Sequence, residues 1–152
     1  MWRVSCFVPK FSVNNERLIF VDTNIWLERL LGQPKANQVG QFLGLIPSDE
    51  IFITDFAFHS LCVILIRLKK HQVLLNFVQD LFIDSDVSLV SIPPDKTPDL
   101  VKAMRRYKLD FDDAYQYLAA KFNGLTLVTF DKDLKRKPLG GRTPAQIIAS
   151  LK

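Results

Sequence analysis

Short apolar runs alternate in this chain with longer segments whose apolar residues recur every three or four positions. A short apolar or β-branched run between turn signals is typical of a strand buried on both faces. Such runs lie at 19–21, 51–53, 86–92 and 125–128. Helical periodicity occupies 24–31, 39–46, 56–70, 72–82, 98–108, 112–122 and 144–151. Strands separated by helices predict an α/β fold, a three-layer α/β/α sandwich with a mainly parallel central sheet.

Residues that favour helix ends mark several boundaries. Thr97 and Thr143 are each followed by proline, which is favoured at the first helical position, so we expect both threonines to be N-caps. Thr23 is expected to cap the first helix. Gly32 and Gly124 follow the last periodic residues of two helices and are expected to end them.

Length and composition indicate one domain. The chain has 152 residues, 48% of them hydrophobic, which is enough for a sizeable core. Residues 1–17 lack periodicity, so we expect an irregular N-terminal extension followed by a domain over 18–152. No apolar stretch is long enough to span a membrane, and Lys10 interrupts what would be the apolar core of a secretory signal. We therefore expect a cytoplasmic protein with no membrane contact.

Aspartates follow two of the predicted strands. Asp22 ends the strand at 19–21, and Asp131 comes shortly after the strand at 125–128. Asp113 lies at the start of the helix 112–122, beside Asp112 and close to Asp110. In parallel α/β sheets, ligands bind beyond the carboxyl ends of the strands. Carboxylates that converge there repel one another unless a cation neutralises them, and oxygen ligands of this kind suit Mg²⁺ or Mn²⁺.

Each aspartate also has a purely structural explanation. Aspartate is favoured at N-caps and in first helical turns, so Asp22, Asp131 and one of the residues at 110–113 could each cap a helix. A phosphatase that uses an aspartate after its first strand would need a second aspartate two residues later, where this chain has Asn24. Gly-rich phosphate-binding loops and the GxSxG motif are also absent from the sequence.

Three motifs, in order, resemble those of a known family. They are FVDTNIWLERLL (20–31), DFDDAYQYLAAKFNG (110–124) and LVTFDKDL (127–134), and RTPAQIIASL (142–151) also looks like the family's C-terminal end. From about residue 18 to residue 152 the chain resembles the PIN domain, in the branch of VapC-like toxins of type II toxin–antitoxin systems.

The resemblance implies a site and an activity. It implies a ribonuclease that uses Mg²⁺ or Mn²⁺ to cleave phosphodiester bonds of RNA, with Asp22, Asp113 and Asp131 as metal ligands and catalytic residues. Around these it implies supporting roles for Asn24, Thr129, Asp112 and Asp133. It also implies an antitoxin protein as a partner and a homodimer.

One departure from the family pattern concerns the helix after the second strand. The family usually has a glutamate there, but this chain has His59 and Ser60. Asp55 is the nearest carboxylate, and a role as the cap of that helix is an alternative for it. Three possibilities follow: Asp55 substitutes for the glutamate, the site works with three acids, or the domain is catalytically degenerate and binds RNA or a protein partner without cleavage.

Basic residues gather in the second half of a chain whose net charge is +4 and whose pI is about 9.1. The predicted helix 98–108 carries three of them at helical spacing, and others surround the acidic strand end. Cationic side chains near the site are what contacts with RNA phosphates require, although a solvated surface is the alternative. The candidates are Lys102, Arg105, Arg106, Lys132, Lys135 and Arg136.

Overall fold

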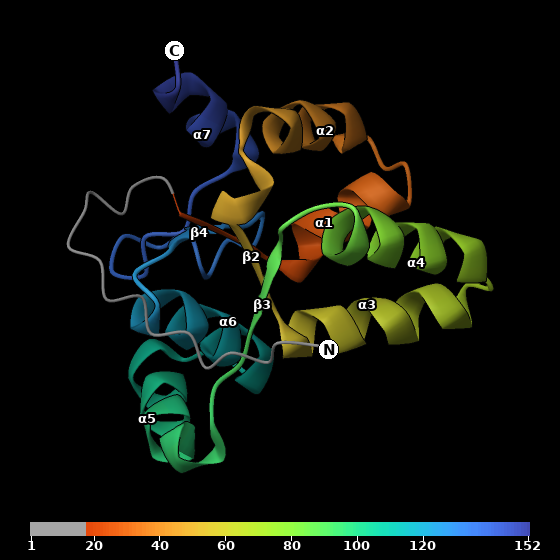
Figure 1. Cartoon of the computed structure of the whole chain (residues 1–152). Coiled ribbons are helices and arrows are strands. Elements are labelled where there is room, and N and C mark those ends of the chain that lie inside the picture. The colour runs from red at the N-terminus through yellow and green to blue at the C-terminus, as the bar shows by residue number, and fades with distance from the viewer. Residues whose placement is uncertain (1–17) are drawn as a thin grey trace.

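The computed structural model describes residues 18–152, so the expectation for 1–17 lies outside the described residues. Its centre is a four-stranded, fully parallel sheet in the order β3-β2-β1-β4. The strands are β1 (Ile19–Val21), β2 (Ile51–Thr54), β3 (Ser88–Val90) and β4 (Thr126–Val128). β1 therefore lies between β2 and β4, and its carboxyl end is flanked on both sides. The predicted parallel α/β architecture is confirmed (Figure 1).

Within residues 18–152, seven α-helices connect and cover the strands. Those on the first half of the chain are α1 (Thr23–Leu30), α2 (Ala36–Leu45), α3 (Asp55–Arg67) and α4 (His71–Val78). The second half contributes α5 (Thr97–Tyr107), α6 (Phe111–Phe122) and α7 (Pro144–Ser150). Short helical turns, η2 (Ser48–Glu50), η3 (Gln79–Ile83) and η4 (Pro94–Lys96), lie between them. None of the helices within 18–152 is long and apolar enough to cross a membrane.

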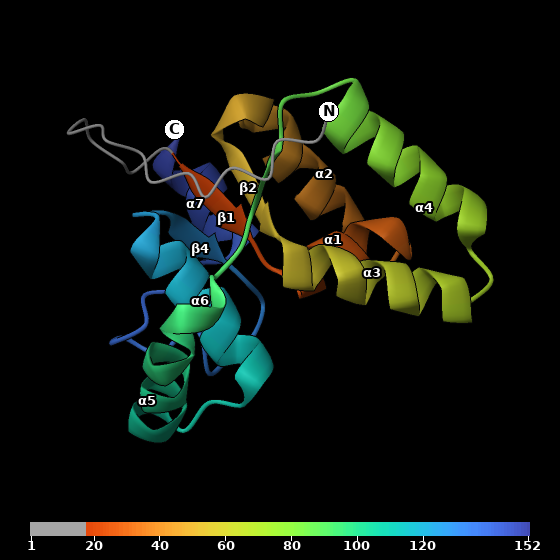
Figure 2. The same cartoon turned by 60° about the horizontal axis from the view of Figure 1, so that its bottom comes forward.

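Alternation along the strands produces two separate cores. Phe20, Phe52 and Leu127 belong to the cluster that packs against α5 and α6. Their strand neighbours face the other way and join the cluster formed with α1, α2, α3 and α7, as Val21 and Val128 do. Successive strand residues point to opposite faces, so each strand supplies both cores. Figure 2 shows the α5–α6 pair on one side of the strands and α1 to α4 on the other.

Several helix starts differ from the predictions by one residue. The N-cap of α1 is Asp22, whose side chain accepts a hydrogen bond from the Thr23 amide, so Thr23 is the first helical residue. Thr97 likewise begins α5, because η4 precedes it and the Thr97 hydroxyl donates to the Pro94 carbonyl. Thr143 caps α7 as predicted, with a complete capping box. Gly32 and Gly124 both have positive φ where α1 and α6 end, as expected.

Candidate active site

Two strand ends and one helix start form the site. Asp22 follows β1, and its amide donates to Val128 of β4, which ties the ends of the two strands together. Thr129 follows β4 and is fully buried, while Asp22 is 5% exposed. The Thr129 hydroxyl donates to Asp22 Oδ2 at 2.7 Å. The parallel pairing of β1 and β4 is what brings residues from the two strand ends into direct contact.

Asn24 connects the same two strand ends through its side chain. Its Nδ2 donates to Asp22 Oδ2 at 3.3 Å and to Thr129 Oγ1 at 3.2 Å. Its Oδ1 accepts from the Phe130 amide at 3.1 Å. Asn24 therefore holds the segment after β4 against the start of α1.

The three aspartates at the start of α6 differ in what their carboxylates contact. Asp110 is the N-cap, and its side chain accepts a hydrogen bond from the Asp113 amide. Asp113 lies in the first turn and is partly buried, with its carboxylate free of a capping role. Asp112 is exposed in the same turn. Of these three, Asp113 is the one whose carboxylate lies close to those of Asp131 and Asp133.

Asp131 organises the loop that follows β4. Its Oδ1 accepts from the amides of Asp133 and Leu134 at 2.8 and 3.3 Å. Residues 132–135 form turns, not the short helix that we considered for this segment. The turn brings Asp133 back toward the strand end, so that one oxygen each of Asp113, Asp131 and Asp133 lie within 4.8 Å of one another. We call these three residues the acidic cluster.

Burial and nearby negative charges raise the pKa of Asp113, in the acidic cluster, and of Asp22 beside it. The pKa of Asp113 is raised to about 7, first by burial and then by the charges of Asp131, Asp110, Asp22 and Asp133. Burial also raises the pKa of Asp22, and the charge of Asp131 adds to this, while hydrogen bonds oppose it. Carboxylates held this close favour a bound cation. The donor set is composed of oxygen atoms alone, which fits Mg²⁺ or Mn²⁺.

Two residues that were not predicted from the sequence belong to the surroundings of Asp22. Gln116 contacts Asp22 directly, and Thr54 is linked to it through Gln116. Gln116 Nε2 donates to Asp22 Oδ1 at 2.9 Å, and the hydroxyl of Thr54 donates to Gln116 Oε1 at 2.6 Å. Gln116 is 2% exposed and lies in the otherwise apolar segment AYQYLAA, three positions after Asp113. Residues three apart share a helix face. A polar residue on a buried face, one turn after a candidate ligand, was therefore the signal that could have revealed Gln116.

Asp55 lies outside the acidic cluster and does not cap α3. The N-cap of α3 is Thr54, whose hydroxyl accepts from the Ala57 amide. Asp55 Oδ1 instead accepts from its neighbour Phe56 and from the Tyr115 hydroxyl, each at 2.7 Å. At the position of the family's glutamate, Ser60 is partly buried and His59 is exposed. No carboxylate of α3 belongs to the acidic cluster.

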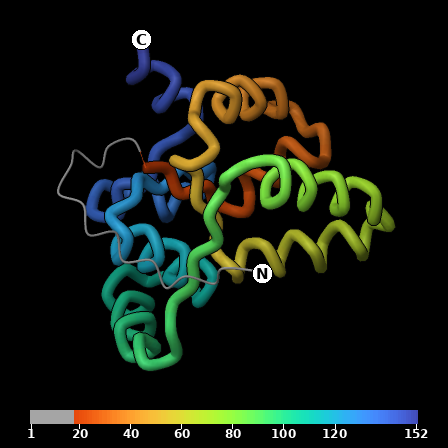
Figure 3. The backbone as a smooth tube through the Cα atoms, in the orientation of Figure 1, coloured from red at the N-terminus to blue at the C-terminus, as the bar shows by residue number. Residues whose placement is uncertain are grey.

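Most of the basic candidates lie on the surface of α5 and of the loop after β4. Lys102, Arg105 and Arg106 line an open hollow of about 780 Å³ on α5, together with Thr97, Pro98 and Val101. Lys132 is exposed and Lys135 is partly buried. Arg136 already has structural partners, since its guanidinium donates to the carbonyls of Asp133 and Tyr107. It thereby ties the loop to the end of α5; Figure 3 traces both segments, in blue and in green.

Comparison with known proteins identifies the family of this chain. The sequence matches the PIN domain family model over residues 19–139, most of the chain. The chain therefore belongs to the PIN domain family. No curated protein is similar enough in sequence to count as a match.

Solved structures have the same fold. A toxin–antitoxin complex from Klebsiella pneumoniae has a TM-score of 0.67 and 24% identity, covering 83% of this chain and 97% of that one. FitAcB from Neisseria gonorrhoeae has a TM-score of 0.66 and 21% identity, covering 84% and 98%. VapC20 of Mycobacterium tuberculosis, described as a sarcin-ricin loop cleaving toxin, has a TM-score of 0.66 and 17% identity, covering 77% and 92%. These findings confirm the resemblance predicted from the motifs.

Proposed function

We propose that this PIN domain is an endoribonuclease that depends on Mg²⁺ or Mn²⁺ and acts in the cytoplasm as the toxin of a toxin–antitoxin pair. The observation that carries the proposal is the acidic cluster, with three carboxylate oxygens within 4.8 Å beside the buried Asp22. Like charges at this distance destabilise the fold unless a cation neutralises them, so the cluster supports a metal site.

Asp113, Asp131 and Asp133 would hold the ion. Asp22, which we also predicted as a ligand, lies at the base of the site with both carboxylate oxygens hydrogen-bonded, and it is not one of the three residues of the acidic cluster. A bound divalent cation supplies positive charge for the scissile phosphate and makes a water molecule easier to deprotonate. The protein's own contribution is to keep the carboxylates in place: Asp110 fixes the start of α6, and the turn after Asp131 presents Asp133. Thr129 and Asn24 keep the Asp22 carboxylate oriented.

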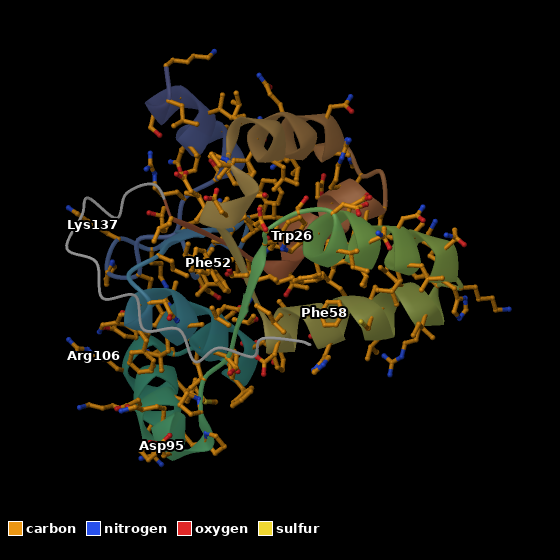
Figure 4. The ribbon with its side chains drawn as sticks, in the orientation of Figure 1. Trp26, Phe52, Phe58, Asp95, Arg106 and Lys137 are labelled. Atoms are coloured by element: carbon orange, nitrogen blue, oxygen red, sulfur yellow. The ribbon has the colours of Figure 1, made fainter. Side chains whose placement is uncertain are left out.

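Charge supports RNA as the substrate. Within residues 18–152 the one ion pair joins Arg136 to Asp133, so the cations of α5 have no carboxylate partner there. Figure 4 shows Arg106 of α5 and Lys137 of the loop after β4 extending outward on the same side of the molecule. A polyanion that contacted both would pass the loop that carries Asp131 and Asp133. Unpaired cations on the same molecule as a cation-binding site suit a strand whose phosphates extend beyond the cleaved bond.

Exposed apolar residues on α3 and α4 support a protein partner, either an antitoxin or a second copy of the chain. Val63 and Ile66 of α3 are 47% and 48% exposed, and Leu75 of α4 is 62% exposed. A further hollow on α3, of about 330 Å³, is lined by Phe56, His59, Ser60, Val63 and Ile64. Contiguous exposed apolar surface is typical of protein contacts. The similar structures include a toxin–antitoxin complex, which agrees with such a partner.

The direct test is cleavage of a mixed RNA pool by purified protein with Mg²⁺, with Mn²⁺ or with chelator. Asp113→Asn and Asp131→Asn should each remove metal-dependent cleavage, because each takes one ligand from the cluster. Asp49→Asn removes the same charge at an exposed position outside the cluster and should cleave normally. Growth arrest on expression, relieved by Asp113→Asn, would support the toxin role.

The alternative is a degenerate PIN domain that binds RNA or a protein without cleavage. The observation that favours it is that Ser60, not a carboxylate, stands near the position of the family's glutamate. The nearest carboxylate, Asp55, instead accepts a hydrogen bond from the Tyr115 hydroxyl. A folded, partner-free protein that binds RNA but leaves the whole pool intact in either metal would establish this alternative and reject the nuclease.

A further inference from the structure

The carboxylate of Asp22 is held by more donors than any other acidic side chain at the site. Oδ1 accepts from the Thr23 amide at 2.8 Å and from Gln116 Nε2 at 2.9 Å. Oδ2 accepts from the Thr129 hydroxyl at 2.7 Å and from Asn24 Nδ2 at 3.3 Å. A carboxylate has about four lone-pair positions, so these donors occupy all of them. The orientation of this buried group is therefore determined by its neighbours.

Gln116 differs from the other three donors in its origin. Thr23 and Asn24 belong to the segment that follows Asp22, and Thr129 lies at the end of the adjacent strand. Gln116 comes from the middle of α6, the helix that also carries Asp113. Its hydrogen bond joins the carboxylate at the base of the site to the helix of the acidic cluster.

The partners of Gln116 determine how its amide is oriented. Thr54 Oγ1 accepts from the Ala57 amide at 2.9 Å, so its own proton is free to be donated, and it goes to Gln116 Oε1 at 2.6 Å. With Oε1 accepting, Nε2 is the atom that faces the Asp22 carboxylate. The reverse orientation would set the Gln116 oxygen against a carboxylate oxygen. The chain Ala57 N–H, Thr54, Gln116, Asp22 is thus satisfied in one arrangement only.

We infer that Gln116 is a positioning residue, which holds the Asp22 carboxylate in register with the acidic cluster and links it through Thr54 to the start of α3. The expected effect on metal binding rests on the proposed function. The positioning of Asp22 itself rests on the hydrogen-bond geometry. α3 supplies no carboxylate to the cluster. Instead, Thr54, the N-cap of α3, is linked to Asp22 through the neutral side-chain amide of Gln116. Gln116 of α6 therefore connects the end of β1 with the start of α3.

The test measures Mn²⁺ affinity by titration calorimetry in full-length protein, with thermal unfolding as the check of folding. Gln116→Leu keeps the volume and removes both hydrogen bonds. We expect Mn²⁺ to bind about 10-fold more weakly, because the Asp22 carboxylate is then no longer held beside the acidic cluster, and losses of this size are usual when a residue that supports a metal site is removed. Gln79→Leu is the matched control, because Gln79 also donates to an aspartate, Asp84, at 2.9 Å, but on the exposed surface. It should bind Mn²⁺ like the unchanged protein.

Thr54 variants separate positioning from mere stability. Thr54→Ser retains the hydroxyl and should retain affinity, whereas Thr54→Val should weaken Mn²⁺ binding, by less than the roughly 10-fold loss expected for Gln116→Leu, because Gln116 keeps its own hydrogen bond to Asp22. In a Gln116→Leu background, Thr54→Val should still lower the unfolding temperature, because α3 loses its cap, but should not weaken Mn²⁺ binding further. If Thr54 acted through stability alone, Thr54→Val would weaken Mn²⁺ binding as much in the Gln116→Leu background as in the unchanged protein.

A second readout keeps the inference separate from the proposed function. The side-chain amide signals of Gln116, assigned by their loss in Gln116→Leu, should shift in NMR spectra of Asp22→Asn and of Thr54→Val without any metal. If the unchanged protein binds no Mn²⁺, the proposed function fails while these shifts still decide whether Gln116 couples Thr54 to Asp22. Unmoved signals, or unchanged Mn²⁺ affinity in folded Gln116→Leu, would overturn the inference.

Discussion

The hydroxyl of Tyr115 donates a 2.7 Å hydrogen bond to the carboxylate of Asp55. The same hydroxyl accepts from the Ile92 amide at 2.9 Å, so Asp55 is joined to the segment after β3. Asp55 is absent both from the acidic cluster and from the charges that raise the pKa of Asp113. Its contacts are those of a residue that connects α3, α6 and the end of β3.

Asp55→Asn should therefore leave metal affinity nearly unchanged. Asparagine keeps an oxygen that can accept from Tyr115, and the acidic cluster loses nothing. We expect a Mn²⁺ dissociation constant within about 2-fold of the unchanged protein, against a weakening of at least about 10-fold for Asp131→Asn. Calorimetric titration of both variants decides the matter. A loss in Asp55→Asn as large as that in Asp131→Asn would mean that Asp55 replaces the family's glutamate.

Mn²⁺ should raise the unfolding temperature of the protein. A ligand that binds only the folded state at about 100 times its dissociation constant adds about 2.7 kcal/mol. In a domain of this size that corresponds to roughly 5–10 °C. Differential scanning fluorimetry with and without Mn²⁺ measures the shift, which should be small in Asp131→Asn and full in Asp49→Asn. Equal shifts in all three proteins would place the ion elsewhere.

The pH dependence of stability should contain a component from Asp113. The pKa of Asp113 in the folded protein, raised to about 7, lies above the ordinary aspartate value of 3.8, so the folded state binds this proton more tightly than the unfolded state does. The component is therefore fully present at low pH and is lost as pH rises toward and through about 7. Because Asp113 is partly exposed, solvent screening reduces its contribution to the order of 1 kcal/mol.

Urea unfolding in chelator, at pH 5 and at pH 8, isolates this component. Asp113→Asn should lose less stability than the unchanged protein when the pH is raised, since the variant has no carboxylate to ionise beside Asp131. Asp49→Asn serves as the control for a change of net charge alone. An equal loss in Asp113→Asn and in the unchanged protein would contradict the assigned repulsion.

The cations of α5 should determine part of the salt dependence of RNA binding. Each phosphate contact to a single strand contributes about −0.7 to the slope of log affinity against log salt concentration. Replacing Lys102, Arg105 and Arg106 by alanine should reduce the steepness accordingly, whereas Lys69→Ala and Lys70→Ala, at the connection between α3 and α4, should not. Fluorescence anisotropy at several salt concentrations provides the slopes, and an unaltered slope would exclude α5 from the RNA path.

Gly141 should be intolerant of a side chain. A Cβ atom there would come within 2.5 Å of the Leu134 carbonyl oxygen and 3.0 Å of Thr129 Cγ2. Gly141→Ala should therefore cost about 1–3 kcal/mol, as overpacking does. Gly44 in α2 has open space around its Cβ position, so Gly44→Ala should instead stabilise the helix by about 0.5–1 kcal/mol. Urea unfolding of both variants compares them, and a neutral Gly141→Ala would show that the loop after β4 can yield.

The architecture was largely readable from local patterns. Apolar runs at 19–21, 51–53 and 125–128 became β1, β2 and β4, and the run at 86–92 shortened to β3. The strands are parallel to one another because each connection between them contains a helix. Helix starts were less certain: in DFDD and in ITDF several neighbouring polar residues could serve as the cap, and local preference does not distinguish them.

The sequence alone determined which residue types end the strands and begin the helices, because side-chain periodicity and capping act within a few positions. It therefore indicated that Asp22 and Asp131 follow two strands and that Asp113 begins a helix, and the family resemblance predicted that the three belong to one site. Only the tertiary structure brought Asp133 into the cluster, excluded Asp55, and joined Gln116 to Asp22 and to Thr54 across 94 and 62 positions. These pairings depend on how α6 packs across the ends of β1 and β2, and packing between distant segments leaves no periodic trace in the chain.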